Sequence, residues 1–261
     1  MKKTKVISVL NHKGGVGKTA TATNLGAALK FLHECRVLLI DLDGQANLTE
    51  SLGLSKEVED KPTVYEAIKG KCPLPVYVNG DGLEVVPACL DLSAVETELL
   101  GEAGREMLLK NLIKPIRKDY DFILIDCPPS LSLLTLNAMT ASDSLIIPMQ
   151  AEYLAMRGMA KLTSVINTVK ERLNHDLEIE GVLITQYDVR KNLNKTVAEI
   201  VSDMFGKKVF HTYIRGNVTI AEATSSGRDV ISYAPNSVGA KDYISLCEEF
   251  ISMQLAPKTV K

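Results

Sequence analysis

The sequence has no tryptophan, few other aromatic residues and no long apolar run, and these shortages narrow what the chain can be. No apolar segment approaches the roughly 20 residues that a helix needs to cross a bilayer. The basic residues 1–5 lead into a short apolar stretch, which is too short for the hydrophobic core of a signal peptide. We therefore expect neither a membrane anchor nor export, and predict a cytoplasmic protein.

The spacing of the cysteines and the net charge exclude further classes of protein. The five cysteines are scattered and form no C-x-x-C pair, so reduced thiols are expected rather than a metal site or a disulfide framework. Thirty basic and 32 acidic residues give a formal net charge of -2. The chain is not a polycation, so any binding of nucleic acid must come from a local basic patch.

The 261 residues suffice for one large α/β domain and are too few for two. Short β-branched apolar runs alternate with helical patterns, which is typical of a mainly parallel sheet covered on both faces. We predict strands at residues 5–10, 36–40, 83–86, 122–125, 144–148, 181–184 and 208–210. Helices are predicted at about 18–32, 105–117, 132–141, 152–172, 193–205 and 239–253, and one short helix within 55–82. The prediction is a single domain over 1–254 with a twisted sheet of about seven to eight strands, followed by a flexible tail at 255–261.

Residues 11–19, Asn-His-Lys-Gly-Gly-Val-Gly-Lys-Thr, lie between the first apolar run and the first helical pattern. A strand that turns through glycines into a helix N-terminus can bind phosphate, because backbone N–H groups and the helix dipole converge on the anion. Lys18 would reach the terminal phosphates and the Thr19 hydroxyl would ligate Mg²⁺. The alternative is a glycine-rich turn without a ligand. The predicted nucleotide contacts are Gly14, Gly15, Val16, Gly17, Lys18, Thr19 and Ala20.

Aspartates follow two of the predicted strands. Asp126 ends the apolar run Phe-Ile-Leu-Ile, as in a Walker B strand whose carboxylate holds Mg²⁺ through water. Asp41 and Asp43 end another run, and their i, i+2 spacing on an extended chain points both toward the phosphate site. Solvated strand ends or a helix cap are the alternatives. We predict that Thr19, Asp41 and Asp126 form the metal site.

The segment Lys-Gly-Gly-Val-Gly-Lys-Thr departs from the usual phosphate loop, with His12 where a glycine is expected and an added lysine, Lys13. It resembles the deviant Walker A box of the ParA/MinD/Soj ATPases, and the likeness extends over about residues 4–252. The resemblance implies a slow ATPase with ATP and Mg²⁺ as cofactors. It also implies an ATP-dependent homodimer in which Lys13 reaches the partner's nucleotide.

The resemblance also implies residue roles. Asp43 would orient the hydrolytic water, Lys13 and Lys18 would stabilise the charge on the transferred phosphoryl group, and Asp41 would serve the outer shell of Mg²⁺. Residues 128–130 resemble the family's γ-phosphate switch. The family usually has proline and glycine where this chain has Gly44 and Ala46. The segments that hold the base in the family align with Gln186, Arg215 and Asn217, for which ordinary polar loop residues are the alternative.

The resemblance implies a ParB-like centromere-binding partner and non-specific DNA binding, with association with the nucleoid if DNA is bound. The sequence weakens the DNA inference, because Thr219 and Val238 replace two arginines of the family pattern. The remaining basic candidates are Arg190, Lys191, Lys195, Lys207, Lys208, Arg228 and Lys241.

Three functions stay open at this stage. The C-terminal segment 250–257 lacks the basic amphipathic helix of a membrane-binding relative, so no membrane partner is expected. A switch that partitions plasmids or chromosomes is the leading hypothesis. The alternatives are an ATPase that positions protein cargo and a metabolic enzyme of the dethiobiotin-synthetase type.

Overall fold

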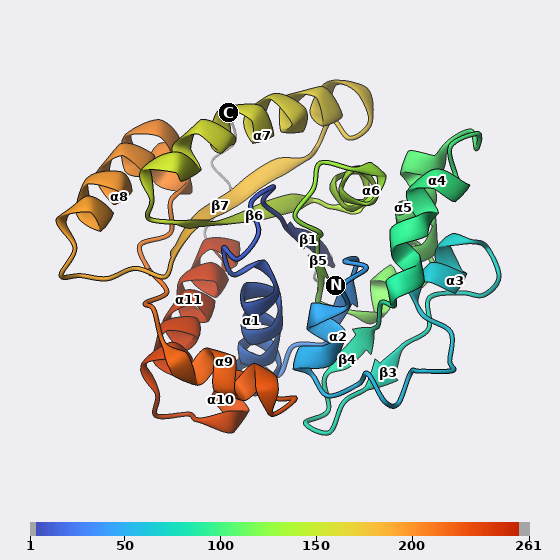
Figure 1. The fold of residues 1–261 in the computed structure, drawn as a ribbon, viewed down its shortest axis with the longest axis horizontal. Coiled ribbons are helices and arrows are strands. Elements are labelled where there is room, and N and C mark those ends of the chain that lie inside the picture. Colours follow the sequence, from blue (N-terminus) through green and yellow to red (C-terminus); the bar gives the residue numbers. More distant parts are fainter. Residues whose placement is uncertain (1–3, 256–261) are drawn as a thin grey trace.

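The computed structural model describes residues 4–255, apart from the side chains of 153–157, and seven strands of this part form one sheet. Their order is β3-β4-β2-β5-β1-β6-β7, and all neighbours except β3 and β4 run parallel (Figure 1). The strands are β1 (Lys5–Val9), β2 (Val37–Asp41), β3 (Tyr77–Val78), β4 (Glu84–Val86), β5 (Phe122–Asp126), β6 (Ser144–Gln150) and β7 (Glu178–Thr185). The predicted α/β class with a mostly parallel sheet is confirmed.

Helices cover both faces of the sheet, as the continuously apolar strands predicted (Figure 1). In β5, Ile123 and Ile125 pack toward one face and Leu124 toward the other, so each strand contributes to two cores. One face carries α1 (Lys18–His33), α2 (Asn47–Ser51), α9 (Val218–Ser225), α10 (Val230–Tyr233) and α11 (Val238–Leu255). The other carries α3 (Val64–Ile68), α4 (Val95–Glu98), α5 (Leu108–Ile113), α6 (Leu133–Ala141), α7 (Tyr153–Arg172) and α8 (Asn192–Phe205).

Two local predictions are wrong, and some elements were missed. The helix expected over 105–117 is divided into a 3₁₀ turn (Arg105–Met107), α5 and a second 3₁₀ turn (Arg117–Asp119), and Pro115 lacks the N–H that would continue the hydrogen bonds of α5. The strand expected over 208–210 is reduced to one bridge between Val209 and Val182. Beyond it, the Phe210 ring packs on β7, at a point where a Cβ on Gly181 would lie 2.3 Å from the ring. The antiparallel strand β3 and the helices α2, α4, α9 and α10 were not predicted.

The sheet order fixes where a site can form. Because β5 lies between β2 and β1, the carboxyl ends of these three strands are neighbours, and Asp41 pairs in register with Asp126. In a parallel sheet, ligands bind beyond these ends. Leu255 is the last residue of α11, so the predicted tail does not begin there, and residues 256–261 lie outside the described part. No helix in residues 4–255 is long and apolar enough to cross a bilayer.

A partly buried ion pair fastens the C-terminal helix to the sheet. Lys5 Nζ of β1 lies 2.5 Å from Glu180 of β7 and donates to Gln254 Oε1 of α11 at 2.6 Å. Gln254 in turn donates to Glu180 at 2.7 Å. Burial raises the pKa of Glu180, but the Lys5 ammonium and the hydrogen bonds outweigh it, so the net pKa is lowered. The ionised carboxylate therefore stabilises the fold.

We predict that Glu180→Gln lowers the free energy of unfolding by about 2 kcal/mol at pH 7, less than for a fully buried pair because Lys5 stays partly exposed. Because folding lowers the pKa of this carboxyl group, its ionised form stabilises the fold at pH values above the unfolded-state pKa near 4.5. This contribution is lost as the pH falls through the folded-state pKa. The gap between wild type and variant should thus shrink in acid. Denaturant unfolding at several pH values measures it. Glu178→Gln is the matched control, since Glu178 is exposed and 3.9 Å from Lys208; equal effects would contradict the prediction.

Candidate nucleotide-binding site

The loop between β1 and α1 forms a cradle of backbone N–H groups. Gly15 and Gly17 have φ angles of +72° and +87°, in the left-handed region that favours glycine. A Cβ on Gly14 or Gly15 would meet no atom within 4 Å, so the inner face of the loop is open. The 16-residue helix α1 starts at Lys18 and directs its positive dipole end at this space. The geometry fits a bound phosphate.

His12 packs outside the cradle, and Lys18 is held beside it. The His12 ring lies against α7, at a point where a Cβ on Gly158 would come within 2.0 Å of it. Lys18 is almost fully buried and its Nζ donates to the Lys13 carbonyl at 3.2 Å. Burial lowers the Lys18 pKa, against the opposing effect of the Asp126 carboxylate. Lys18 is therefore already held close to the phosphate position.

Asp126 and Thr19 together fit a magnesium site. Thr19 Oγ1 donates to Asp126 Oδ2 at 2.6 Å. The second carboxylate oxygen, Asp126 Oδ1, is buried with no hydrogen-bond partner among the described residues. Burial, with the neighbouring Asp41 charge, raises the pKa of Asp126 well above its usual value. A hydroxyl and an unsatisfied carboxylate oxygen are the hard ligands that Mg²⁺ takes, directly or through water.

Both carboxylate oxygens of Asp41 accept hydrogen bonds from residues of the same chain. Its Oδ2 accepts hydrogen bonds from the Thr49 backbone at 2.9 Å and hydroxyl at 2.7 Å, and its Oδ1 accepts from the Asp43 backbone at 3.1 Å. Burial raises the Asp41 pKa to about 6, although the Thr49 bonds lower it. Asp41 thus organises the turn after β2, and its outer-shell role stays a prediction.

Asp43 faces the phosphate cradle across a cavity of about 520 Å³. Gly14, Lys18, Thr19 and Pro129 line the same cavity, so the structure brings together the residues predicted for phosphate, catalysis and the switch. Asp43 Oδ1 accepts from the Gln45 backbone at 3.0 Å, which fixes the carboxylate on the turn. This placement fits a group that orients water.

The two departures from the family pattern lie in this turn. Ala46 has φ +53°, a left-handed conformation that an alanine rarely adopts, and it precedes α2. Gly44 contacts the 3₁₀ turn η1 (Leu90–Ala94), where a Cβ would lie 2.2 Å from Ser93 Oγ. Glycine is required at 44 by this contact, whereas Ala46 holds the turn at a cost in backbone strain.

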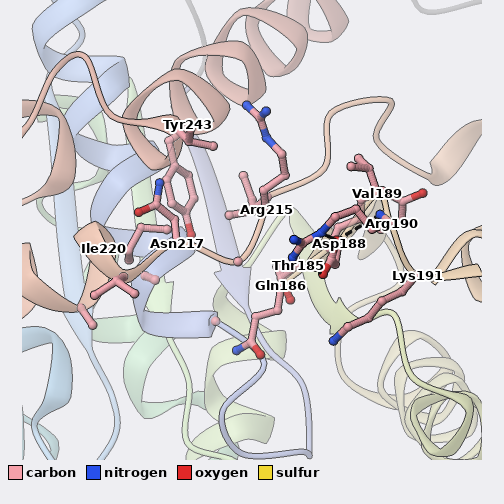
Figure 2. Close-up of a pocket in the computed structure, with 18 residues that line it drawn as sticks. Thr185, Gln186, Asp188, Val189, Arg190, Lys191, Arg215, Asn217, Ile220 and Tyr243 are labelled. Atoms are coloured by element: carbon pink, nitrogen blue, oxygen red, sulfur yellow. Dashed lines mark hydrogen bonds and ion pairs between the residues drawn. The ribbon is translucent and has the colours of Figure 1, made fainter. Parts of the chain in front are cut away.

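A second cavity of about 960 Å³ adjoins the loop and is the candidate base pocket (Figure 2). Gln186, Arg215 and Asn217 line it, as predicted, but each has a partner within the chain. Gln186 donates to the Gly15 carbonyl at 2.8 Å, Arg215 pairs with Asp242, and Asn217 caps α9 by accepting from the Thr219 backbone at 2.8 Å. Their contacts with a base stay predictions.

Lys13 lies at the outer edge of the loop and is 37% exposed. Its Nζ donates to Gln150 Oε1 at 2.9 Å and forms an ion pair of 2.6 Å with Glu152. Both acceptors stand at the end of β6 and the start of α7, so Lys13 turns away from the chain's own phosphate cradle.

Comparisons with known proteins identify the family of this chain. A family model described as an AAA domain matches residues 4–179. The sporulation initiation inhibitor protein Soj of Bacillus subtilis is 44% identical over 248 residues, which cover 94% of this chain and 97% of Soj. The chromosome partitioning protein ParA of Myxococcus xanthus is 42% identical over 250 residues, covering 95% of this chain and 88% of that protein. The chain belongs to the ParA/Soj family of partition ATPases.

A solved structure supports the same fold for this ParA/Soj chain. Cobyrinic acid a,c-diamide synthase from Mycobacterium smegmatis, crystallised with ADP and magnesium, superposes with a TM-score of 0.85 at 34% identity. The match covers 97% of this chain and 96% of the synthase. The α/β P-loop NTPase fold is thereby confirmed for the ParA/Soj chain.

Some lining residues of the ParA/Soj site were missed from the sequence. The buried Tyr243 of α11 lines the base pocket beside Asn217, and Ile220 of α9 lines it too (Figure 2). Gln150 and Glu152 hold Lys13. These residues belong to no motif that the sequence pattern exposes, so only the fold brings them to the site.

Proposed function

We propose that this ParA/Soj chain is a nucleotide-dependent dimer switch for plasmid or chromosome partition. Mg·ATP would bind through Gly14–Thr19, with the base in the 960 Å³ pocket near Gln186, Arg215 and Asn217. The observation that carries the proposal is the position of Lys13 at the loop edge, where, among the side chains that the structure describes, its Nζ binds Gln150 at the end of β6 and Glu152 at the start of α7. A lysine placed there can leave its partners and reach a second protomer.

In the closed dimer, the two lysines would act on one triphosphate. Lys18 would bind the terminal phosphates from within and Lys13 from the partner, and both would stabilise charge that develops on the transferred group. Asp43 would orient the attacking water across the cavity it lines. When bound at Thr19 and Asp126, Mg²⁺ would neutralise phosphate charge, with Asp41 fixing the turn beside it.

Slow hydrolysis alone, accelerated by a ParB-like partner, would give the ATP state the lifetime that a switch needs. DNA binding would be non-specific and confined to that state. The basic candidates are partly neutralised, since Arg190 pairs with Asp188 and Arg228 with Asp81. We therefore expect weak binding that falls steeply with salt.

An electrophoretic shift with a DNA fragment of arbitrary sequence tests the DNA-binding part. The wild-type protein should shift DNA with Mg·ATP at low salt, and not with Mg·ADP or at several-fold higher salt, because salt cations compete with the basic side chains for the DNA phosphates. The absence of any ATP-dependent shift at low salt would remove DNA from the proposal.

Two alternatives remain to be separated. An ATPase that positions protein cargo would use the same switch, whereas a metabolic enzyme would transfer phosphoryl to a small substrate and has no need of Lys13. The structural neighbour is named a synthase, and this name is a statement about the neighbour alone. Recovery of bound proteins with an Asp43→Ala trap and ATP separates the classes: a DNA-binding partner supports partition, a cargo protein supports positioning, and a monomeric trap without partners supports the metabolic class.

A further inference from the structure

Side chains from the ends of β6 and β7 bind the outward-facing carbonyls of the phosphate loop. Gln150 Nε2 and Gln186 Nε2 both donate to the Gly15 carbonyl, at 3.1 Å and 2.8 Å. Thr185 Oγ1 donates to the Val16 carbonyl at 2.8 Å. We call Gln150, Thr185 and Gln186 the carbonyl clamp. They lie at least 135 positions along the chain from the loop that they hold.

The partners fix the orientation of both amides. Lys13 Nζ can only donate, so Gln150 presents its oxygen to it and its Nε2 to the loop. The Gly15 carbonyl can only accept, so Gln186 presents its nitrogen there and its oxygen to Gln150 Nε2 at 2.7 Å. Every contact in this network pairs a donor with an acceptor.

The clamp acts on the side of the loop opposite to the phosphate. A backbone N–H can point into the cradle only if the carbonyl of the same peptide points out, because the two are antiparallel across a planar peptide. A carbonyl turned inward would repel the anion. Gly15 and Gly17 lack a Cβ and adopt positive φ, so the loop backbone has unusual freedom to turn. Bonds to the carbonyls of Gly15 and Val16 restrict that freedom.

We propose that Gln150, Thr185 and Gln186 are positioning residues that pre-form the phosphate cradle, and that Gln150 links the cradle to Lys13. The second half rests on the proposed dimer switch. Gln150 holds Lys13 with its oxygen and the Gly15 carbonyl with its nitrogen, so one side chain connects the loop to the lysine that serves the partner. Release of Lys13 to a second protomer frees the Gln150 oxygen while the Gly15 carbonyl stays held by Gln186.

ADP affinity tests the clamp without requiring a dimer. We expect Gln150→Met and Gln186→Ala each to weaken ADP binding about fivefold, as loss of one hydrogen bond predicts. The double variant should weaken it less than the product, because Gln150 Nε2 also donates to the Gln186 oxygen, so that each single variant already disturbs the other amide. Calorimetry with Mg·ADP measures affinity. Hydrogen exchange at residues 14–17 of the nucleotide-free protein should become faster in the variants, while melting temperatures stay close to wild type.

Thr185→Val and Thr168→Val form a matched pair. Both remove a hydroxyl that donates to a carbonyl, but Thr168 donates to Ser164 within the exposed part of α7. Only Thr185→Val should weaken ADP. An affinity loss of less than about threefold in the Gln150→Met/Gln186→Ala double variant overturns the clamp. Should Thr185→Val unfold, Gln150→Met still decides the question through hydrogen exchange at residues 14–17, because Gln150 holds the Gly15 carbonyl and does not line the base pocket.

Gln150→Glu tests the link to Lys13. It keeps an acceptor for Lys13, adds a charge beside Glu152 and removes the donor to Gly15. We expect ADP affinity to fall as in Gln150→Met, and the ATP-dependent dimer to weaken more than in Gln150→Met. Equal dimers in the two variants would overturn the link. If wild type itself forms no dimer with ATP, the proposed switch fails while the ADP measurements still decide the clamp.

Discussion

Lys13→Ala should bind nucleotide like wild type and remain monomeric with ATP. Its Nζ binds Gln150 and Glu152 among the described side chains, and neither belongs to the cradle, so removal costs the cradle little. In the proposed dimer the same ammonium would lie buried against the partner's phosphates. A buried charge pair at an interface contributes about 2–5 kcal/mol, so the dimer should weaken by roughly 30-fold or more. Light scattering with Mg·ATP gives the mass, and titration with a fluorescent ADP gives nucleotide affinity.

The control for Lys13→Ala is Lys71→Ala. Lys71 is an exposed lysine 5.5 Å above the Tyr65 ring, away from the nucleotide cavities. It should dimerise as wild type does. A Lys13→Ala protein that still dimerises at the wild-type ATP concentration would refute the role across the interface. A variant that loses ADP binding would instead place Lys13 in its own cradle.

Asp43→Ala should stop hydrolysis and lengthen the life of the ATP state. The carboxylate lines the cavity between the phosphate loop and Pro129, where an attacking water would stand. Loss of a group that orients or activates water costs about 10²–10⁴-fold in rate. Nucleotide binding should be retained, because the loop glycines, Lys18 and Thr19 are untouched. Phosphate release measures the rate, and the decay of dimer mass after ATP removal measures the lifetime.

Two control variants show whether the effect of Asp43→Ala is specific to that residue. Glu59→Ala removes an exposed carboxylate that does not line the cavity, and should hydrolyse ATP like wild type. Asp41→Ala removes the bonds to Thr49 and should lower stability as well as activity, which separates a structural aspartate from a water-orienting one. Hydrolysis by Asp43→Ala within threefold of wild type would exclude the proposed role, since the expected loss is about 100-fold or greater.

The sequence predicted the parts of the site that lie within short segments. Residues 14–19 form one turn and the start of one helix, so their order in the chain is also their order in space. Asp43 and Asp126 follow apolar runs, and the sheet order then brings the two turns together. An apolar strand followed by a charged turn can be recognised within one short segment, so the sequence alone places these aspartates at the ends of strands.

Contacts between distant segments could not be predicted in this way. Gln150 lies 137 residues from Lys13, and nothing local to either marks the pair. Gln186 was predicted as a base contact because its segment aligns with one that holds the base in the family. Its positive φ of +50° and its bond to Gly15 depend instead on how β7 lies against the loop. The strand predicted at 208–210 pairs with β7 at one bridge, Val209 with Val182, and the length of this pairing depends on a segment distant in the chain.

The left-handed backbone at Ala46 would influence how the proposed switch resets. A non-glycine residue in this region costs about 1–2 kcal/mol, and that energy would be returned if the turn left its present conformation. Departure would then be favoured roughly 5–30-fold over a chain with glycine at 46. One methyl group would thus bias the turn that carries Asp43 toward rearrangement.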